Sequence, residues 1–155
     1  MSPKSRKPSR RLSGVERSFG TQARFGPVAL RSKAKYRGQT IGCGVDVVEL
    51  VRFRRAVRRG GEAFIRRVFT EREVAYARAR RRTILLHLAG RFAAKEAVMK
   101  ALSQGDPTRV PAMNQIEGRN DRFGRPHIRL LDGRPARARV HVSLSHVDTV
   151  AVASA

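Results

Sequence analysis

The stretch AGRFAAKEAVMKAL, residues 89–102, is rich in alanine and decides the fold. Its composition and apolar spacing predict a helix from about residue 83 to residue 102. One face of that helix carries two small residues, an acid and a base: Ala89, Ala93, Glu96 and Lys100. A separate stripe is apolar: Leu88, Phe92, Met99 and Leu102. Since residues three, four and seven positions apart share a helix face, Glu96 is expected on a lane of small side chains.

Glu96 has two interpretations at this stage. As a solvated residue it pairs with Lys100 four positions on, and such a pair stabilises a helix by about 0.2–0.5 kcal/mol. As a site residue it holds a cation, because the alanines leave room for a ligand or another element. Arg91, Lys95 and Lys100 would then hold phosphate oxygens nearby. This second interpretation needs a second carboxylate.

Asp46 is the candidate for that second carboxylate. It lies in IGCGVDVVEL, residues 41–50, whose alternation predicts a first strand. One face of the strand is apolar and the other carries glycines and the acid: Ile41, Cys43, Val45 and Val47 against Gly42, Gly44 and Asp46. The missing Cβ atoms of the glycines let another element or a ligand approach closely. The alternative is that Asp46 caps the following helix.

Two carboxylates on separate elements, with bases around them, favour a magnesium site. Mg²⁺ needs few protein oxygens, keeps water ligands and bridges to substrate phosphates. The patterns GxxxxGK[ST] and GxGxxG do not occur in the part of the sequence expected to be ordered. The sequence therefore indicates phosphate chemistry without a P-loop.

Two further helices are expected between the strand and the alanine-rich helix. In the first, apolar residues recur at helical spacing over residues 50–57, and Gly60-Gly61 is expected to end it. Its other sides carry arginines: Arg52, Arg54, Arg55, Arg58 and Arg59. The second opens at Thr70 with Glu73 three residues later, which is a capping-box pattern.

The remainder of the chain is typical of short strands separated by turns. Strands are expected near Met113–Gly118, Pro126–Leu131, Ala138–Ser145 and Thr149–Ala153. The order strand, helices, antiparallel strands predicts an α+β domain with helices packed on an antiparallel sheet. This domain is expected to cover residues 41–155.

Residues 1–40 differ from the rest in composition, with eleven Lys or Arg and one acid, Glu16. A segment so poor in periodic apolar positions predicts a disordered basic tail. Three meanings stay open: a nucleic-acid arm, a targeting peptide, or an extension without a role. The whole chain of 155 residues has a formal net charge of +22, which indicates a polyanionic partner.

The single cysteine, Cys43, excludes an internal disulfide framework and suits a reducing cytosol. No run of about 18 apolar residues occurs, so no transmembrane segment is expected. Both observations predict a cytoplasmic protein.

His146 ends the alternating stretch RVHVSLSH, residues 139–146, which is expected to be a strand. A histidine at a strand end is either a surface residue or one that orients a phosphate or moves a proton near neutral pH. Its position alone does not choose between the two.

Four segments in this order, GVDVVEL, VFTEREVAYA, LAGRFAAKEAVMKAL and HVSLSH, resemble the small bacterial holo-[acyl-carrier-protein] synthases. The resemblance covers about residues 41–153 and implies the fold of the 4′-phosphopantetheinyl transferases. It implies Mg²⁺-dependent transfer of 4′-phosphopantetheine from coenzyme A to a serine of apo acyl carrier protein. Adenosine 3′,5′-bisphosphate would be released, and the reaction would serve fatty acid biosynthesis.

The resemblance also implies roles for single residues. Asp46 and Glu96 match metal-binding carboxylates that take part in catalysis. Arg91 and Lys100 match bases near the phosphates of the coenzyme, and His146 matches an active-site histidine. Either Asp46 or a metal-bound water would accept the proton of the serine.

Two kinds of partner are implied as well. Acyl carrier proteins are acidic, so the arginine-rich helix is expected to bind one through Arg52, Arg55 and Arg59. The family resemblance further implies a homotrimer with active sites between subunits.

Two departures from the family pattern keep alternatives open. The stretch SQGDPTRVPAMNQIEG, residues 103–118, lacks the expected glycine-rich run, and the segment before Arg139 is shortened. A degenerate, inactive homologue is therefore one alternative. The other is a basic nucleic-acid-binding module, although only 6% of residues are aromatic and no RNP-like or zinc-finger signature occurs. Such a module would also leave Asp46 and Glu96 unexplained.

Overall fold

The structure, a computed structural model, describes residues 42–105, 107–133 and 139–155. The expected basic tail of residues 1–40 lies outside the described residues. The helices are α1 (Leu50–Val68), α2 (Glu71–Arg78) and α3 (Ile84–Ser103), with short 3-10 turns at Arg81–Thr83, Pro107–Arg109 and Met113–Gln115. The strands are β1 (Val45–Glu49), β2 (Ile116–Asn120), β3 (Pro126–Leu130), β4 (Ser143–His146) and β5 (Val150–Ser154). No helix in this part of the chain is both long and apolar enough to cross a membrane.

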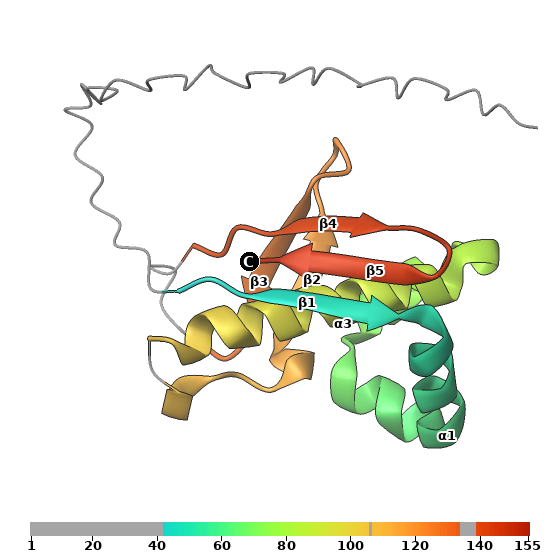
Figure 1. Ribbon diagram of the computed structural model, residues 1–155, viewed down its shortest axis with the longest axis horizontal. Coiled ribbons are helices and arrows are strands. Elements are labelled where there is room, and N and C mark those ends of the chain that lie inside the picture. Colours follow the sequence, from blue (N-terminus) through green and yellow to red (C-terminus); the bar gives the residue numbers. More distant parts are fainter. Residues whose placement is uncertain (1–41, 106, 134–138) are drawn as a thin grey trace, which may run out of the picture. The chain divides into compact units, whose positions relative to one another are not determined.

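The strands form two antiparallel sheets rather than one (Figure 1). The larger has the order β1-β5-β4, in which Asp46 lies opposite Ala153 and Ala153 opposite Leu144. The smaller is the β2–β3 hairpin. Three helices and antiparallel strands in one chain confirm the predicted α+β class.

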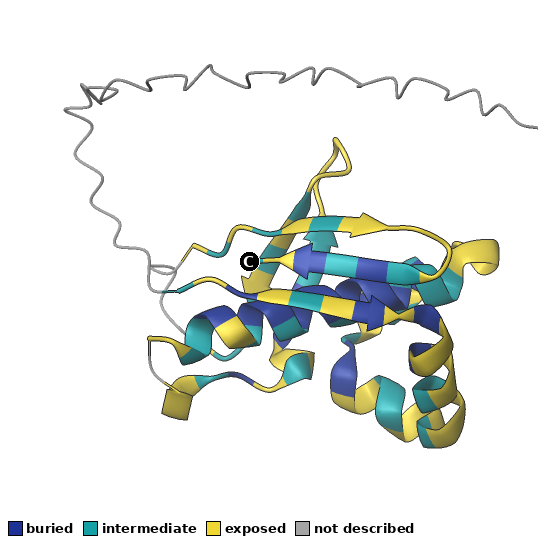
Figure 2. Cartoon of the chain, in the orientation of Figure 1, coloured by how far each residue is buried: buried dark blue, intermediate teal, exposed yellow. Residues whose placement is uncertain are grey.

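Helix α3 is the centre of the core and contacts both sheets. Figure 2 shows its buried residues behind the larger sheet. The approach is close because a Cβ atom at Gly44 would collide with the carbonyl oxygen of Ala97, and one at Gly42 with that of Ala101. The segment with Gly42 and Gly44 therefore lies directly on α3, as the sequence suggested, although the strand predicted over residues 41–50 is shorter and covers only Val45–Glu49.

The other face of the larger sheet is uncovered in the single chain and carries valines beside serines. Val45 and Val47 are 59% and 60% exposed, and they lie beside Ser154 and Val152 of β5. Burial of such side chains is worth about 1.5–3 kcal/mol each, so a row of exposed valines on a sheet is typical of a surface that binds another chain.

Helix α1 does not end at Gly60-Gly61 as predicted. It continues to Val68 across a kink at Gly61, whose backbone has φ 52° and ψ −145°. Glycine adopts this conformation without a steric penalty, so the chain bends here and returns to helix. The second half can then place Phe64 against Phe53 and Phe92, with ring centroids 6.2 and 6.4 Å away.

The predicted capping box at the start of α2 is present. Glu73 donates its backbone N–H to the Thr70 hydroxyl oxygen (3.3 Å), and the Thr70 N–H donates to the Glu73 carboxylate (2.9 Å). Helix α3 also lies within one residue of its predicted bounds.

Two strand predictions were partly wrong. Residues 113–115 form a 3-10 turn, so the predicted strand at Met113–Gly118 begins only at Ile116. The strand predicted at Ala138–Ser145 is β4, and residues 139–142 have no ladder partner. Residues 134–138 lie outside the described residues. Alternation alone cannot show where a neighbouring strand ends, and the hydrogen-bonded register decides it.

Candidate active site

Asp46, Glu96 and Lys100 form a group at the contact between β1 and α3, which we call the carboxylate cluster. The Lys100 ammonium donates to Asp46 Oδ1 (2.8 Å) and to the Val45 carbonyl (2.9 Å). Asp46 does not cap α1, because the N-cap residue is Glu49 and it makes no side-chain cap. Lys100 likewise forms its ion pair with Asp46, so the simple Glu96–Lys100 helix pair is not what the structure shows.

The negative charge of Asp46 acts on Glu96. Partial burial is the largest cause that raises the pKa of Glu96 above its ordinary value of 4.5, and the charge of Asp46 raises it further. Lys100 opposes this shift, and the hydrogen bond to Asp46 is the main cause that raises the pKa of Lys100 itself. The carboxylates of Asp46 and Glu96 therefore repel each other, and a cation bound between them would be attracted by both.

The cluster fits a hard divalent cation with few protein ligands. Glu96 and Asp46 supply carboxylate oxygens from two separate elements, which suits Mg²⁺. Among the described residues, no three or more His, Cys, Asp or Glu side chains gather into a complete metal site. Any remaining ligands would have to be water or substrate oxygens, which is the usual situation for Mg²⁺ bound with phosphates.

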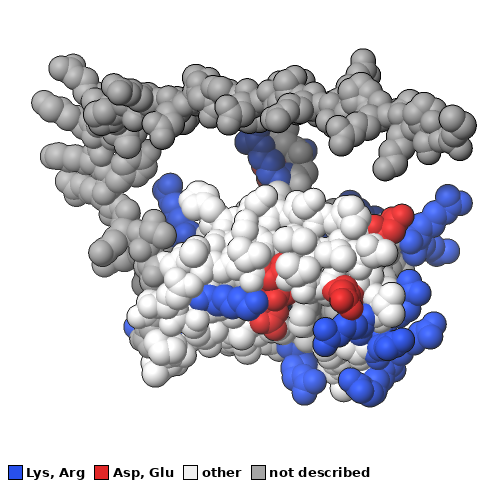
Figure 3. Space-filling model, in the orientation of Figure 1, with Lys and Arg blue, Asp and Glu red and all other residues white. Residues whose placement is uncertain are grey.

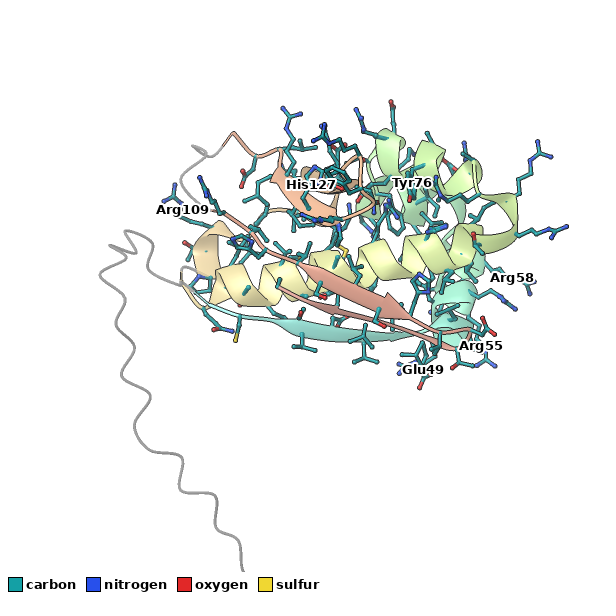
Figure 4. The ribbon with its side chains drawn as sticks, turned by 90° about the horizontal axis from the view of Figure 1, so that it is seen from above. Glu49, Arg55, Arg58, Tyr76, Arg109 and His127 are labelled. Carbon is teal, nitrogen blue, oxygen red and sulfur yellow. The ribbon has the colours of Figure 1, made fainter. Side chains whose placement is uncertain are left out.

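A second group of candidate residues surrounds a cavity of about 230 Å³, which we call the basic pocket. Its polar and aromatic lining comes from α2, α3, β4 and the β2–β3 hairpin: Tyr76, His87, Arg91, Asn120, His127 and His146. Figure 4 shows Tyr76 and His127 on one side of α3, with β1 and the labelled Glu49 on the other. The basic pocket and the carboxylate cluster thus lie on different sides of the same helix.

Arg91 is the centre of the basic pocket and is only 9% exposed. Its guanidinium donates to the His87 carbonyl (3.3 Å) and to Asn120 Oδ1 (3.1 Å), and lies 4.0 Å from the centroid of the Tyr76 ring. The buried Nε of Arg91 has no hydrogen-bond partner among the described residues. Arg80 stacks on the same tyrosine at 3.5 Å, so two guanidinium groups lie against one ring, and no ion pair among the described residues engages either of them.

The pocket disfavours further positive charge and favours an anion. Burial is the largest cause that lowers the pKa of His87, followed by the charges of Arg91, Arg80 and His146. An orphaned buried donor together with convergent cations is what a phosphate-binding site requires.

Single residues from the sequence analysis thus divide into two sets. Asp46, Glu96 and Lys100 meet at one place, and Arg91 and His146 line the other. Lys95 belongs to neither, because it is buried on another side of α3, and its predicted place beside Glu96 was wrong.

Four of the pocket residues named above were missed by the sequence analysis: Tyr76, His87, Asn120 and His127. His87 lies four residues before Arg91 on the same helix, so the helical period was a signal that could have found it. Tyr76 and Asn120 had no such signal, since their contacts join segments far apart in the chain.

The arginines of α1 remain exposed, including Arg52, Arg55 and Arg59. Figure 3 shows basic side chains gathered over α1. No ion pair within the described residues engages them. They therefore present an uncompensated positive surface to a partner.

The sequence of the chain is similar to those of known proteins. Residues 42–155 match the 4′-phosphopantetheinyl transferase superfamily. The holo-[acyl-carrier-protein] synthase of Protochlamydia amoebophila (strain UWE25) is 39% identical over 119 residues, which is 75% of this chain and 96% of that protein. That of Clostridium tetani (strain Massachusetts / E88) is 38% identical over 114 residues, 68% of this chain and 86% of that protein.

Solved structures are similar over the same part of the chain. The crystal structure of a holo-(acyl-carrier-protein) synthase from Bacillus anthracis str. Ames, in complex with CoA (3′,5′-ADP), has a TM-score of 0.60 at 34% identity. The match covers 74% of this chain and 92% of that one. The synthase from Neisseria meningitidis has a TM-score of 0.63 at 28% identity, over 75% and 96% of the two chains. With a match that spans every described strand and helix, the chain belongs to the 4′-phosphopantetheinyl transferase superfamily.

Proposed function

We propose that the chain transfers 4′-phosphopantetheine from coenzyme A to a serine of apo acyl carrier protein and releases adenosine 3′,5′-bisphosphate. The observation that carries this proposal is the grouping of Asp46, Lys100 and Glu96 at the β1–α3 contact, where Lys100 bonds Asp46 and the charge of Asp46 acts on Glu96. Relatives named holo-[acyl-carrier-protein] synthase, and the Bacillus anthracis structure with its coenzyme, support it. A role in fatty acid biosynthesis and a cytoplasmic location remain predictions.

The carboxylate cluster is proposed to work on the pyrophosphate. Asp46 and Glu96 would hold Mg²⁺, which neutralises charge on the pyrophosphate and on the leaving bisphosphate when it is bound. Lys100 is a strongly basic donor beside them, since its pKa is raised by its hydrogen bond to Asp46. It therefore keeps its proton and can hold a phosphate oxygen of the coenzyme.

The basic pocket is proposed to bind the phosphate of the coenzyme that is not part of the pyrophosphate. Arg91 supplies an unpartnered buried N–H, and His146 lies on the rim at the end of β4. A phosphate has the oxygens to accept from both residues. His146 would thus orient the coenzyme, in addition to any proton transfer.

We infer a homotrimer in which the carboxylate cluster of one subunit meets the basic pocket of the next. We call the cluster and the pocket the two half sites. Within one chain the carboxylate cluster and the basic pocket lie on different sides of α3, so one coenzyme would have to span the helix to use both. The exposed valine face of the larger sheet supplies an apolar surface for assembly. An interface at this face would bring the cluster of one subunit to the pocket of the next.

The carrier protein is proposed to dock on α1. Arg52, Arg55 and Arg59 are exposed and unpaired, and an acidic partner would supply the missing carboxylates. Because exposed charges are screened within about 8–10 Å at physiological salt, raised salt should weaken carrier binding before it weakens metal binding.

The decisive experiment mixes the protein with coenzyme A, Mg²⁺ and apo acyl carrier protein, and weighs the carrier by mass spectrometry. We expect a gain of one phosphopantetheine, which chelation of the metal or omission of the coenzyme abolishes. Glu96→Gln should lower this activity. Glu71→Gln is its matched control and should keep the activity, since Glu71 is exposed on α2 and belongs to neither half site. No gain together with tight RNA binding would support the nucleic-acid-binding alternative instead, and no gain without it would support an inactive homologue.

A further inference from the structure

A fully buried ion pair lies on the side of α3 that neither half site uses. Lys95 is 0% exposed and Glu73 is 1% exposed, and the Lys95 Nζ is 2.6 Å from the Glu73 Oε2. Nζ also donates to the carbonyls of Val68 (2.8 Å) and Met113 (2.9 Å). An ammonium has three N–H donors, so all three are satisfied.

The carboxylate of Glu73 is satisfied from other segments. Its Oε1 accepts the backbone N–H of Gly118 (2.8 Å), and its Oε2 accepts that of Thr70 (2.9 Å). Through Lys95 and Glu73, the middle of α3 is therefore bonded to the end of α1, the start of α2, the turn at residue 113 and strand β2.

Stability alone is a weak reason for such a pair. The attraction between two buried charges often does no more than offset their desolvation, and apolar residues of the same size can replace them at little cost. Buried, fully bonded pairs do fix geometry, because loss of either partner leaves a charge without compensation.

The geometry that this pair fixes concerns both half sites. Consecutive residues of a helix project about 100° apart, so holding Lys95 towards α2 turns Glu96 towards β1 and Asp46. Gly118, which Glu73 holds, lies two residues before Asn120 on β2. Asn120 in turn holds the Arg91 guanidinium.

We propose that Lys95 and Glu73 are a positioning pair that sets the rotation of α3 and the place of β2, and so holds the carboxylate cluster and the basic pocket in register. Neither residue belongs to the carboxylate cluster or lines the basic pocket. The proposal rests on the proposed function only for its kinetic readout, because metal and nucleotide binding can be measured without turnover.

The test compares Lys95→Met with the double variant Lys95→Met/Glu73→Gln. The single variant buries an uncompensated carboxylate, so its melting temperature should be much lower than that of the wild type. The double variant has no charge at either position and should regain part of the lost melting temperature, although the carbonyls of Val68 and Met113 lose their donor. Arg81→Met is the control, since Arg81 is exposed and lies outside both half sites.

In the double variant we expect the dissociation constants for Mn²⁺ and for adenosine 3′,5′-bisphosphate to rise about 10-fold or more despite the regained stability, since small misplacements of site residues cost this much. The KM for coenzyme A should rise with them. We also expect weaker nuclear Overhauser contacts between Arg91 and the Tyr76 ring, a readout that needs no ligand.

If binding constants, KM and Overhauser contacts all return to wild-type values with the melting temperature, the pair is only structural and the proposal is overturned. Should the double variant fail to fold, Glu73→Gln alone decides, because it keeps the size of the side chain while it removes the charge that faces Lys95 and one of the two oxygens that accept from Gly118 and Thr70. Unchanged binding and unchanged Arg91–Tyr76 contacts in Glu73→Gln would reject the proposal. The two proposals can fail separately. If the wild-type protein makes no holo carrier but the variants still bind Mn²⁺ and adenosine 3′,5′-bisphosphate more weakly than it does, the proposed function is rejected and the positioning pair stands.

Discussion

The carboxylate cluster and the basic pocket are both built on α3 but are held together in different ways. At the cluster, β1 lies against the helix because Gly42 and Gly44 have no side chains, and Asp46 reaches Lys100 directly. At the pocket, Arg91 depends on side-chain partners such as Tyr76 from other segments. Close backbone approach therefore positions the carboxylate cluster, and a network of side chains positions the basic pocket.

The largest expected effect comes from removing one charge from the cluster. Glu96→Gln keeps the shape of the side chain but halves the formal charge available to a divalent cation, so turnover should fall about 100-fold or more. Carrier binding should change little, because α1 is untouched. The rate of holo carrier formation and the affinity for carrier protein, measured separately, check this. Intact turnover in the variant would show that the metal role of Glu96 is wrong.

The next effect would break the link between cluster and pocket without touching either. Val47→Lys places a charge in the exposed valine face, which should prevent assembly and lower turnover about 100-fold, as buried unpaired charges are not tolerated in interfaces. Analytical ultracentrifugation reports the oligomeric state, and nuclear magnetic resonance reports whether the single chain stays folded. Leu131→Lys, which places the same charge at an exposed apolar residue outside the valine face, is the control. An active monomer would contradict the shared site.

Substitution of a glycine sharpens the difference in how the two places are held. In Gly44→Ala the new Cβ atom meets the Ala97 carbonyl and must push β1 off α3, at a cost of about 1–3 kcal/mol in unfolding free energy and with weaker metal binding. Gly90→Ala is the matched control, because its Cβ meets only Leu144 at an ordinary 3.6 Å. In a helix interior that change should stabilise by about 0.5–1 kcal/mol. Denaturant titration compares the two, and equal effects would refute the close-approach argument.

A conservative change in the pocket should have the opposite signature to that of Glu96→Gln. Arg91→Lys keeps the charge but loses the planar group that reaches Asn120 and stacks on Tyr76. We expect the KM for coenzyme A to rise about 10-fold, a loss of about 1.4 kcal/mol, with Mn²⁺ affinity unchanged. Steady-state kinetics and Mn²⁺ titration test this, and a variant that loses metal affinity instead would show that the two half sites are not separate.

The smallest expected effect is a pH dependence of the unfolding free energy that arises from His87 in the pocket. Burial, and then the charges of Arg91 and Arg80, hold the pKa of His87 below its ordinary value of 6.5. As pH falls below 6.5, the unfolded chain takes up this proton before the folded one does, so unfolding becomes easier. His87→Phe should flatten the dependence of the unfolding free energy on pH in this range, and bound adenosine 3′,5′-bisphosphate should flatten it in the wild type. A slope unchanged by both would remove His87 from the account.

The parts of the fold that local signals encode were predicted. The alanine-rich helix and the Thr70–Glu73 capping box were both confirmed, because each depends on residues within one or two turns. Asp46 and Glu96 were also brought together as expected, since alternation in a strand and periodicity in a helix assign each to a face. Their role in metal binding stays a prediction.

The errors arose where the outcome depends on distant segments. Helical periodicity gives the direction of Lys95 but not what covers it, and Glu73 and the carbonyl of Met113 supply a buried environment that the helix alone does not reveal. The stop expected at Gly60-Gly61 failed because packing of Phe64 against other rings favours a second helical segment. Asn120 was missed because it reaches Arg91 across 29 positions of the chain.

The bend at Gly61 limits how α1 could be imitated by an inhibitor. A synthetic peptide with the sequence of residues 50–68 would lack the aromatic rings that hold the two segments at their angle, and short helices are marginal in water. Such a peptide would unwind at the glycines, and its arginines would no longer share one rigid frame. A compound meant to compete for the carrier should therefore copy the segment before Gly60 and brace it by chemical cross-linking.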